Sequence, residues 1–519
     1  MRKQYLVTAQ EMKRYDTNTI EKYHMPGLLL MERAALVTVE ELQCIRGSVP
    51  CRVLVVAGRG NNGGDGLAIG RLFMLQGYEV TFLMPGEDIY ARCTEEVKRQ
   101  IDILQAYQAR IFSRLPEGEY DIVIDAVFGV GLSRAVEGIW TDVIQWINRS
   151  NAFVCSVDIP SGIHADTGKV MGCAVQADLT VTYGFRKAGH ILYPGTVYSG
   201  KLVCRQMGID ERSFLGEEPY WYTYTGKEQG LLPARRPDGN KGTFGKALLI
   251  VGSREIAGAA MMAAKSTFRI GAGMVKVITT DENREALQQF VPEAMLLTYT
   301  GDMSREDTTW MRKLAEAEKW ADCILIGPGI GTGPTAHRLL QFGISESRLP
   351  LVIDADGLNM LAEDPGLLSA MASRENQDRT IILTPHLGEF SRIFGCTVMQ
   401  AKENLTEYPR QIADRLHCII VCKDARTVVV QYMGRQGYIN TTGNSGMATA
   451  GSGDVLAGMI TGLLAQGMTG MDAAVAGVYL HGRAGDLAAE SETETAMMAT
   501  DIISCIKEAV MKDSREAVG

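Results

Sequence analysis

The chain has 519 residues, 46% of them hydrophobic and 22% charged, with a formal net charge of −9. This length and composition fit a globular protein of two or more domains, the charge argues against a nucleic-acid partner, and no apolar run approaches the roughly 18–20 residues of a membrane span. Because its 11 cysteines are scattered and no secretory signal is visible, we expect a cytoplasmic protein.

The first half alternates short apolar runs with helical stretches. Thr8 and Glu11 form a capping-box pattern before a predicted helix, and a second helix is predicted over 28–35. Such alternation is typical of βαβ units and a mostly parallel sheet. The predicted strands of this half are Val53–Ala57, Val80–Met84, Ile122–Ala126, Phe153–Val157 and Leu179–Tyr183.

A glycine-rich loop follows the first of these strands. Residues 58–63 match the G-x-G-x-x-G pattern of dinucleotide-binding folds, but the strand 80–84 does not end in the acidic residue that usually accompanies it. The adjoining Asn61, Asn62 and Asp65 add oxygen ligands suited to a hard cation or a polar substrate. A plain tight turn, which would need only the glycines, is the alternative.

Two more polar groups come at strand ends of this half. Asp125 closes one strand, and Asp158 and Ser161 follow the next. In an open α/β sheet the carboxyl ends of the strands border the ligand crevice, so these residues and the glycine loop should converge on one site. The alternative is that each aspartate only caps a helix.

Together these motifs resemble the NAD(P)H-hydrate epimerase domain, also called the YjeF N-terminal domain. The resemblance covers about residues 1–215 and rests on segments 61–66, 125–129 and 157–162. It implies that Asp158 meets the substrate near the reacting ring and that Asn62, Asp125 and Ser161 bind a potassium ion. The residues implied to contact the hydrated dinucleotide are Asn61, Asn62, Gly63, Gly64, Asp65, Gly129, Val130, Gly131, Leu132, Ser133, Arg134, Ala135, Trp140 and Asp158.

The alternation of apolar runs and helical stretches becomes irregular after Gly208, and we interpret residues 210–241 as a connection. A second α/β half then begins, in which the last two predicted strands could form a hairpin. The predicted strands are Ala247–Val251, Val275–Thr279, Cys323–Ile326, Leu351–Ile353, Thr380–Leu383, Ile419–Lys423, Val428–Gln431 and Gly437–Ile439.

The glycine-rich segment 444–458 is the most informative motif of this half. Its small residues run into a helix, whose N-terminus exposes backbone N–H groups and favours phosphate. Asp454 would repel phosphate there, so its role is chemical: to take a proton from a hydroxyl, or to hold a cation. The alternative is an ordinary aspartate in the first turn.

Two further candidates are His386, in a loop after a strand, and Lys423, at a strand end. His386 could contact a ligand, although a lone loop histidine is more often structural. Lys423 could meet a nucleotide phosphate, although surface lysines are common.

This half resembles the ADP/ATP-dependent NAD(P)H-hydrate dehydratase domain, which has a ribokinase-like fold, over about residues 225–510. The resemblance implies that Asp454 lies at the substrate hydroxyl. The residues implied to bind the hydrated cofactor are Ala259, Gly329 or Gly331, His386 and Asp454. Those implied to hold the adenine nucleotide are Lys423, Asp424, Ala425, Arg426, Thr427, Gly451, Ser452 and Gly453.

The two resemblances predict an α/β protein with a Rossmann-like three-layer domain over 1–217 and a ribokinase-like domain over 225–515. They imply a metabolite-repair enzyme that epimerises the hydrates NADHX and NADPHX and dehydrates the S form with ADP or ATP. Asp158 and Asp454 would be the catalytic residues. Potassium would serve the first site, Mg²⁺ would accompany the nucleotide at the second, and we expect a homo-oligomer with no membrane partner.

Two other functions fit parts of this pattern. One is a small-molecule kinase of the ribokinase-like class with a regulatory N-terminal domain, which would release a stable phosphorylated product. The other is a non-catalytic nucleotide-binding protein, which the polar residues in both halves argue against.

Overall fold

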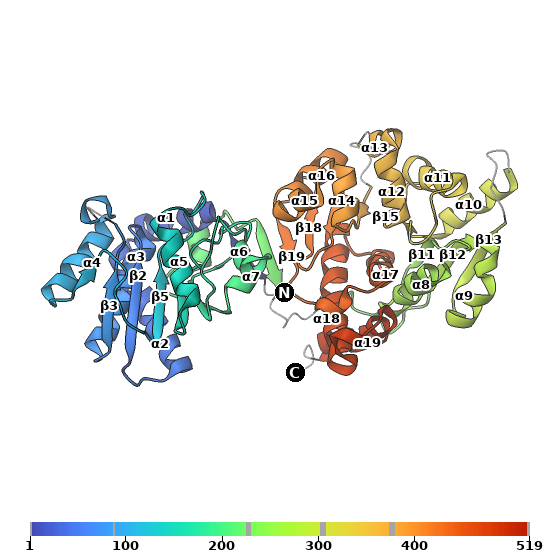
Figure 1. The fold of residues 1–519 in the computed structure, drawn as a ribbon. Coiled ribbons are helices and arrows are strands. Elements are labelled where there is room, and N and C mark those ends of the chain that lie inside the picture. Colours follow the sequence, from blue (N-terminus) through green and yellow to red (C-terminus); the bar gives the residue numbers. More distant parts are fainter. Residues whose placement is uncertain (1–2, 87–88, 225–229, 301–307, 373–378, 516–519) are drawn as a thin grey trace. The chain divides into compact units, whose positions relative to one another are not determined.

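The computed structural model describes residues 3–86, 89–224, 230–300, 308–372 and 379–515. Its contacts divide the chain into two compact units. The N-terminal unit is Tyr5–Trp221, and the C-terminal unit begins at Tyr222 and includes the start of the chain up to Gln4 (Figure 1).

The N-terminal unit is built on a seven-stranded parallel sheet in the order β4-β3-β2-β5-β6-β7-β9. The order reverses between β2 and β5, which marks the crevice where ligands bind in such sheets. All five predicted strands are confirmed, whereas β4 and β9 were not predicted. The bounds are β2 (Arg52–Ala57), β3 (Glu79–Leu83), β4 (Ile111–Phe112), β5 (Ile122–Ala126), β6 (Phe153–Val157), β7 (Leu179–Tyr183) and β9 (Lys201–Arg205).

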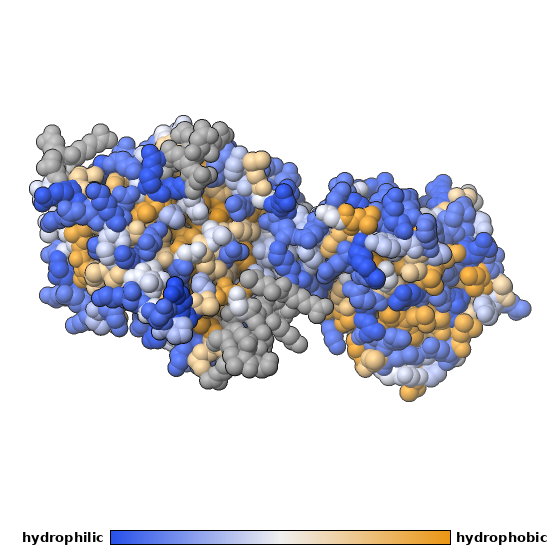
Figure 2. All heavy atoms as spheres, turned by 180° about the vertical axis from the view of Figure 1, so that it is seen from behind, coloured by the Kyte–Doolittle hydropathy of each residue, from blue (hydrophilic) through white to orange (hydrophobic). Residues whose placement is uncertain are grey.

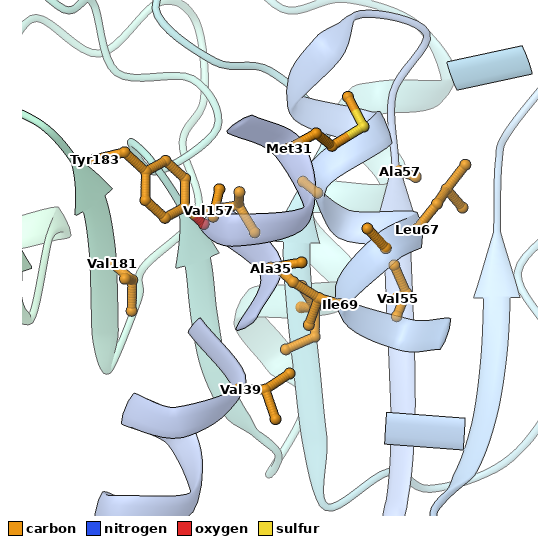
Figure 3. Packing of buried hydrophobic residues seen from close by; sticks show 14 of the residues in the cluster. Met31, Ala35, Val39, Val55, Ala57, Leu67, Ile69, Val157, Val181 and Tyr183 are labelled. Carbon is orange, nitrogen blue, oxygen red and sulfur yellow. The ribbon is translucent and has the colours of Figure 1, made fainter. Parts of the chain in front are cut away.

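Helices cover both faces of this sheet, so the predicted three-layer arrangement is confirmed. Val55 packs beneath α2 and α3 on one face (Figure 3), whereas Leu54 and Val56 pack against Ile144 of α5 on the other. The predicted capping box at Thr8 is present, and the second helix runs well past the predicted 28–35. The helices are α1 (Ala9–Lys22), α2 (Gly27–Arg46), α3 (Asn61–Leu75), α4 (Glu95–Ala106), α5 (Ile139–Arg149), α6 (Ala188–Ile191) and α7 (Gly195–Tyr198).

The helix α3 lies unusually close to the sheet. A Cβ atom on Gly70 would lie 2.7 Å from a methyl of Val55 and closer still to the ring of Phe82. Only glycine fits at this contact, and the close packing holds the N-terminus of α3 at the carboxyl end of β2.

The C-terminal unit contains a mixed sheet in which β13-β12-β11-β14-β15-β16-β17 are parallel and β18 and β19 follow antiparallel. The predicted strands and the predicted hairpin are confirmed. The stretch predicted as a connection contains a strand, β10 (Trp221–Tyr224). The bounds are β11 (Lys246–Ile250), β12 (Met274–Thr280), β13 (Met295–Tyr299), β14 (Cys323–Ile326), β15 (Leu351–Ile353), β16 (Ile381–Leu383), β17 (Ile419–Cys422), β18 (Val428–Gln431) and β19 (Gly437–Ile439).

Helices α8 and α17 pack closely in this unit. Gly458 of α17 contacts α8 so tightly that its own Cβ atom would lie 3.0 Å from the Cα of Ala263 and closer still to Ser266. Thr267 of α8 donates to the carbonyl of Gly458 at 2.9 Å. The helices are α8 (Ala257–Arg269), α9 (Arg284–Phe290), α10 (Thr308–Trp320), α11 (Pro334–Gln341), α12 (Asp356–Glu363), α13 (Pro365–Ala372), α14 (Leu387–Phe394), α15 (Val398–Glu403), α16 (Tyr408–Leu416), α17 (Ser452–Ala465), α18 (Gly470–Ala496) and α19 (Ala499–Arg515).

The surface is mixed in polarity. Figure 2 shows hydrophilic side chains over most of the face in view, with hydrophobic patches between them. Among the helices of the described ranges, none has an apolar stretch long enough to cross a bilayer.

Gly458→Ala should destabilise the C-terminal unit by about 1–3 kcal/mol, because the added methyl forces α17 away from α8. Thermal and denaturant unfolding would measure the loss. The matched control is Gly333→Ala, at a position where a Cβ atom meets nothing within 4 Å. Equal stability of the two variants would contradict the close packing.

Candidate active sites

A cavity of about 760 Å³ opens where β2 and β5 end in the N-terminal unit. The structure brings most of the predicted epimerase residues to its wall. Gly63, Gly64, Asp125, Ala135 and Ser161 are not part of the lining. The predicted residues that line it are Asn61, Asn62, Asp65, Gly129, Val130, Gly131, Leu132, Ser133, Arg134, Trp140 and Asp158.

The two glycine-containing loops of this cavity touch each other. The amide of Gly58 donates to the carbonyl of Ala126 at 2.9 Å. A Cβ atom on Gly129 would lie 3.1 Å from the Cβ of Asn62. The convergence predicted for the ends of β2 and β5 is therefore present, and the loops lie on opposite sides of the switch point in the sheet.

Asp125 and Ser161 are hydrogen-bonded to each other outside the cavity lining, whereas Asn62 is part of the lining. The carboxylate of Asp125 is fully buried and accepts hydrogen bonds from the Ser156 hydroxyl at 2.7 Å and the Ser161 amide at 2.9 Å. The Ser161 hydroxyl accepts from the amide of Phe128 at 2.8 Å. Burial raises the pKa of Asp125, and the hydrogen bonds from Ser161 oppose that shift.

These three residues fit a monovalent cation. Asp125 is fully buried and has no ion-pair partner among the described residues. A buried carboxylate without a counter-charge is costly, so a cation would compensate it. One carboxylate with neutral oxygens provides less charge than Mg²⁺ ordinarily recruits.

Asp158 lies at the end of β6 in a strained conformation. Its φ is +66°, in the left-handed region that residues with a side chain rarely adopt. Its carboxylate accepts from the Thr182 hydroxyl at 2.9 Å and pairs with the ammonium of Lys187. Burial alone would raise the pKa of Asp158, but the charge and hydrogen bond of Lys187 bring it below its ordinary value.

Asp65 is in the opposite electrostatic situation. Burial raises its pKa well above the ordinary value, and the negative charges of Asp158 and Asp16 add to the shift. The same cavity therefore holds Asp158, whose pKa is lowered, together with Asp65 and Asp16, whose pKa values are raised.

Sequence reasoning missed the residues that hold Asp158. Lys187 belongs to a two-residue strand, β8 (Arg186–Lys187), which pairs in parallel with Val7 of β1 (Lys3–Val7). His190 follows one helical turn later. Neither residue lies in a glycine-rich or strand-end motif, so no local pattern singled them out.

The second site lies where β14, β15, β16 and β17 end in the C-terminal unit. The ammonium of Lys423 donates to the carboxylate of Asp354 at 2.7 Å, and the hydroxyl of Thr384 donates to the same oxygen at 2.8 Å. A Cβ atom on Gly453 would lie 3.3 Å from that ammonium. The N-terminus of α17, which carries Asp454, therefore meets the ends of these strands.

Two carboxyl groups of this site have strongly raised pKa values. Burial raises the pKa of Asp454 to about 7, and the negative charge of Asp354 adds to the shift. Burial likewise raises the pKa of Glu389 to about 7, against the attraction of Lys423. Each group is poised to gain or lose a proton near neutral pH, as general acids and bases require.

His386 has a structural role in this site. Its Nδ1 accepts from the amides of Gly388 at 3.0 Å and Glu389 at 3.4 Å and so caps α14. Its Nε2 lies 3.3 Å from the Glu389 carboxylate. The side chain is still 56% exposed, so its outer edge is open to a ligand.

The remaining predicted dehydratase residues lie in helix α8, in the loop after β14, in the turn after β17 and at the start of α17. A Cβ atom on Gly329 would lie 2.9 Å from that of Ala259, which places these two residues side by side, and the amide of Gly331 donates to Asp356 at 2.9 Å. The segment 423–427 is the turn between β17 and β18. Gly451 and Ser452 begin α17, and Ser452 lies 3.4 Å from Nε2 of the buried His481. Sequence reasoning assigned no role to Asp354 or Glu389, which the fold brings beside Lys423.

The chain thus has two α/β units, each with a polar site at the carboxyl ends of parallel strands and at the N-terminus of a helix. Residues 27–189 match the sequence model of the YjeF-related protein N-terminus, and residues 247–508 match that of NAD(P)H-hydrate dehydratase. The chain belongs to the family of bifunctional NAD(P)H-hydrate repair enzymes, which confirms the resemblances predicted from its motifs.

Full-length relatives support this membership. The bifunctional NAD(P)H-hydrate repair enzyme Nnr of Moorella thermoacetica is 36% identical, over 96% of this chain and 95% of the relative. The Escherichia coli K12 enzyme of that name is 33% identical, over 93% and 90%. A solved ADP/ATP-dependent NAD(P)H-hydrate dehydratase from Bacillus subtilis, co-crystallized with ATP/Mg²⁺, is 28% identical over 55% of this chain and 95% of its own, with a TM-score of 0.45.

Glu389→Gln should stabilise the C-terminal unit at pH 8 by on the order of 2 kcal/mol. The folded-state pKa of Glu389, about 7, lies above the unfolded value, so the folded state binds the extra proton. Its stability contribution is full below the unfolded pKa and is lost as pH rises through about 7. The neutral amide avoids that loss.

Unfolding measured at pH 5 and pH 8 tests this effect. The gain should shrink strongly at pH 5, where the wild-type carboxyl is largely protonated. Glu285→Gln, at an exposed position, is the control and should change stability little at either pH. A Glu389→Gln variant that is less stable at pH 8 than the wild type would refute the assigned protonation.

Proposed function

We propose that this chain repairs hydrated NADH and NADPH in two steps. The N-terminal unit interconverts the R and S epimers, and the C-terminal unit dehydrates the S epimer with ADP or ATP. The observation that carries the proposal is the position of Asp454, which has a pKa of about 7, at the N-terminus of α17 beside Lys423. It provides a base next to a phosphate-binding helix end, in a chain of the bifunctional family.

Dehydration requires a better leaving group than hydroxide. Asp454 would take the proton of the C6 hydroxyl while the hydroxyl oxygen attacks the terminal phosphoryl group of the nucleotide. The backbone amides of residues 451–453 would stabilise the negative charge that develops. The C6–O bond then breaks, phosphate leaves, and loss of a proton from C5 restores the 5,6 double bond.

Lys423 and the segment 424–427 would hold the nucleotide phosphates. The ion pair with Asp354 fixes the ammonium of Lys423 at the end of β17, so little side-chain freedom is lost on binding. Mg²⁺ would enter with the nucleotide and neutralise phosphate charge near Asp454.

In the N-terminal unit, Asn62, Asp125 and Ser161 would hold potassium, which supplies positive charge behind the cavity wall. Asp158 would act on the hydrated ring, and the loop 129–135 and Trp140 would contact the dinucleotide. The expected homo-oligomer, cytoplasmic location and domain limits of 1–217 and 225–515 stay predictions.

Incubation with S-NADHX and ADP tests the proposed function directly. NADH absorbance should return, and AMP and free phosphate should appear in equal amounts. A stable phosphorylated product without NADH would instead indicate a small-molecule kinase.

Asp454→Asn should lower the dehydration rate of S-NADHX by roughly 10²–10⁴-fold, because an amide cannot take the hydroxyl proton. The rate is followed by NADH absorbance, and circular dichroism verifies the fold. Asp158→Ala is the matched control, since it changes a carboxylate of the other site and should dehydrate S-NADHX normally. Near-normal dehydration by Asp454→Asn would refute its role as base.

Asp125→Asn should abolish potassium stimulation of R-to-S conversion and slow the reaction at least about tenfold. The amide keeps the shape of the side chain but removes the one negative charge of the proposed cation site. Rates are measured against KCl, with choline chloride keeping the ionic strength constant. The exposed Asp142→Asn is the control. A wild-type enzyme indifferent to potassium would contradict the cation site.

A further inference from the structure

Lys187 is a fully buried lysine for which the proposed mechanism has no role. Its side chain is 0% exposed, and its ammonium donates to the Thr182 hydroxyl at 2.8 Å and to the carboxylate of Asp158. A buried ammonium is costly unless it is paired and hydrogen-bonded, as it is here. The pair is placed at the cavity, because Asp158 is part of the cavity wall.

The same segment also fixes the backbone of Asp158. Nε2 of His190 donates to the carbonyl of Asp158 at 2.9 Å, while its Nδ1 accepts from the amide of Lys187 at 3.0 Å. The amide of Asp158 donates to Val181 at 2.8 Å. These contacts hold the strained φ of +66°, and such strain persists only where the surroundings over-determine a conformation.

Asp65 reaches the same cavity from the first turns of α3. It has no lysine or arginine partner in the part of the chain that the structure describes. The groups that act on it are Asp158 after β6, Asp16 of α1 and, more weakly, Lys187 of β8. Asp158 faces Lys187, His190 of α6 and the Thr182 and Tyr183 positions of β7.

We propose that Asp158 and Asp65 are the base and the acid of the epimerisation, and that Lys187 is the positioning residue that keeps Asp158 as the base. This inference rests on the proposed epimerase function. The pKa values agree with the geometry, since Lys187 lowers that of Asp158 while burial and Asp158 raise that of Asp65. Environments that shift the pKa values of two carboxyl groups in opposite directions are typical of acid–base pairs.

The chemistry balances with these two groups alone. C6 of the hydrate carries a hydroxyl and is bonded to ring N1. Asp158 takes the hydroxyl proton, the C6–N1 bond breaks to leave an aldehyde at C6, and Asp65 gives its proton to N1. Rotation presents the other face of the aldehyde. N1 then attacks C6, returns its proton to Asp65, and the oxygen regains the proton from Asp158 with inverted configuration.

The test uses the full-length protein with R-NADHX as substrate and ADP present, so that each S molecule formed is converted to NADH. Separate assays with S-NADHX confirm that dehydration is not limiting. Lys187→Met keeps the length of the buried side chain but removes its charge, and Lys201→Met, on an exposed residue of β9, is the control. Asp65→Asn and Asp65→Glu test the acid.

Lys187→Met should lower kcat by about 100-fold or more with KM changed less than about threefold. The low-pH limb of its kcat/KM profile should move to higher pH, because Asp158 without its cation gains a proton more readily. The kcat of Asp65→Asn should fall by a similar factor, and Asp65→Glu should recover part of that loss in kcat. Lys201→Met should behave as the wild type.

An unchanged rate and pH profile in a folded Lys187→Met variant would overturn the positioning role. If that variant does not fold, the Asp65 variants decide: a normal rate for Asp65→Asn would overturn the acid–base pair. A wild-type protein that cannot convert R-NADHX at all would refute the epimerase function itself, which is a separate result.

Discussion

The close approach of two helices is the constraint on which both sites depend. Gly70 lets α3 rest on the sheet of the N-terminal unit, and Gly458 lets α17 rest on α8 in the C-terminal unit. Any side chain at either position would push the helix outward. Because each helix N-terminus carries reactive residues, this close packing also sets where Asp65 and Asp454 lie relative to the strand ends.

The second shared feature is the control of buried carboxyl groups. In the N-terminal unit a buried lysine favours the ionised form of Asp158, while Asp65 has no lysine or arginine partner among the described residues. In the C-terminal unit Lys423 is paired with Asp354, and burial raises the pKa of the neighbouring Asp454 to about 7. Burying these ionisable groups costs free energy in both units, and the same burial shifts their pKa values toward what each site requires.

The two sites also differ in a way that fits their proposed tasks. The N-terminal site is a cavity of about 760 Å³ whose lining includes Asp65 and Asp158, the proposed acid and base. The C-terminal site combines a cationic strand end with a helix N-terminus, which suits phosphoryl transfer. Only the second requires a nucleotide, so placing both in one chain joins an isomerisation to a reaction that consumes one isomer.

The sequence by itself determined the α/β class, most of the strands and the motifs at their carboxyl ends, because hydrophobic periodicity and glycine–aspartate clusters are local signals. It could not determine the contact between Gly129 and Asn62, nor the pairing of Lys187 with Asp158, since these join segments separated by dozens of residues. It also gave His386 no definite role, whereas the fold makes it the cap of α14. The pKa values were likewise decided only by tertiary structure: Asp65 and Asp158 are the same residue type, and burial together with neighbouring charge raises the pKa of one and lowers that of the other.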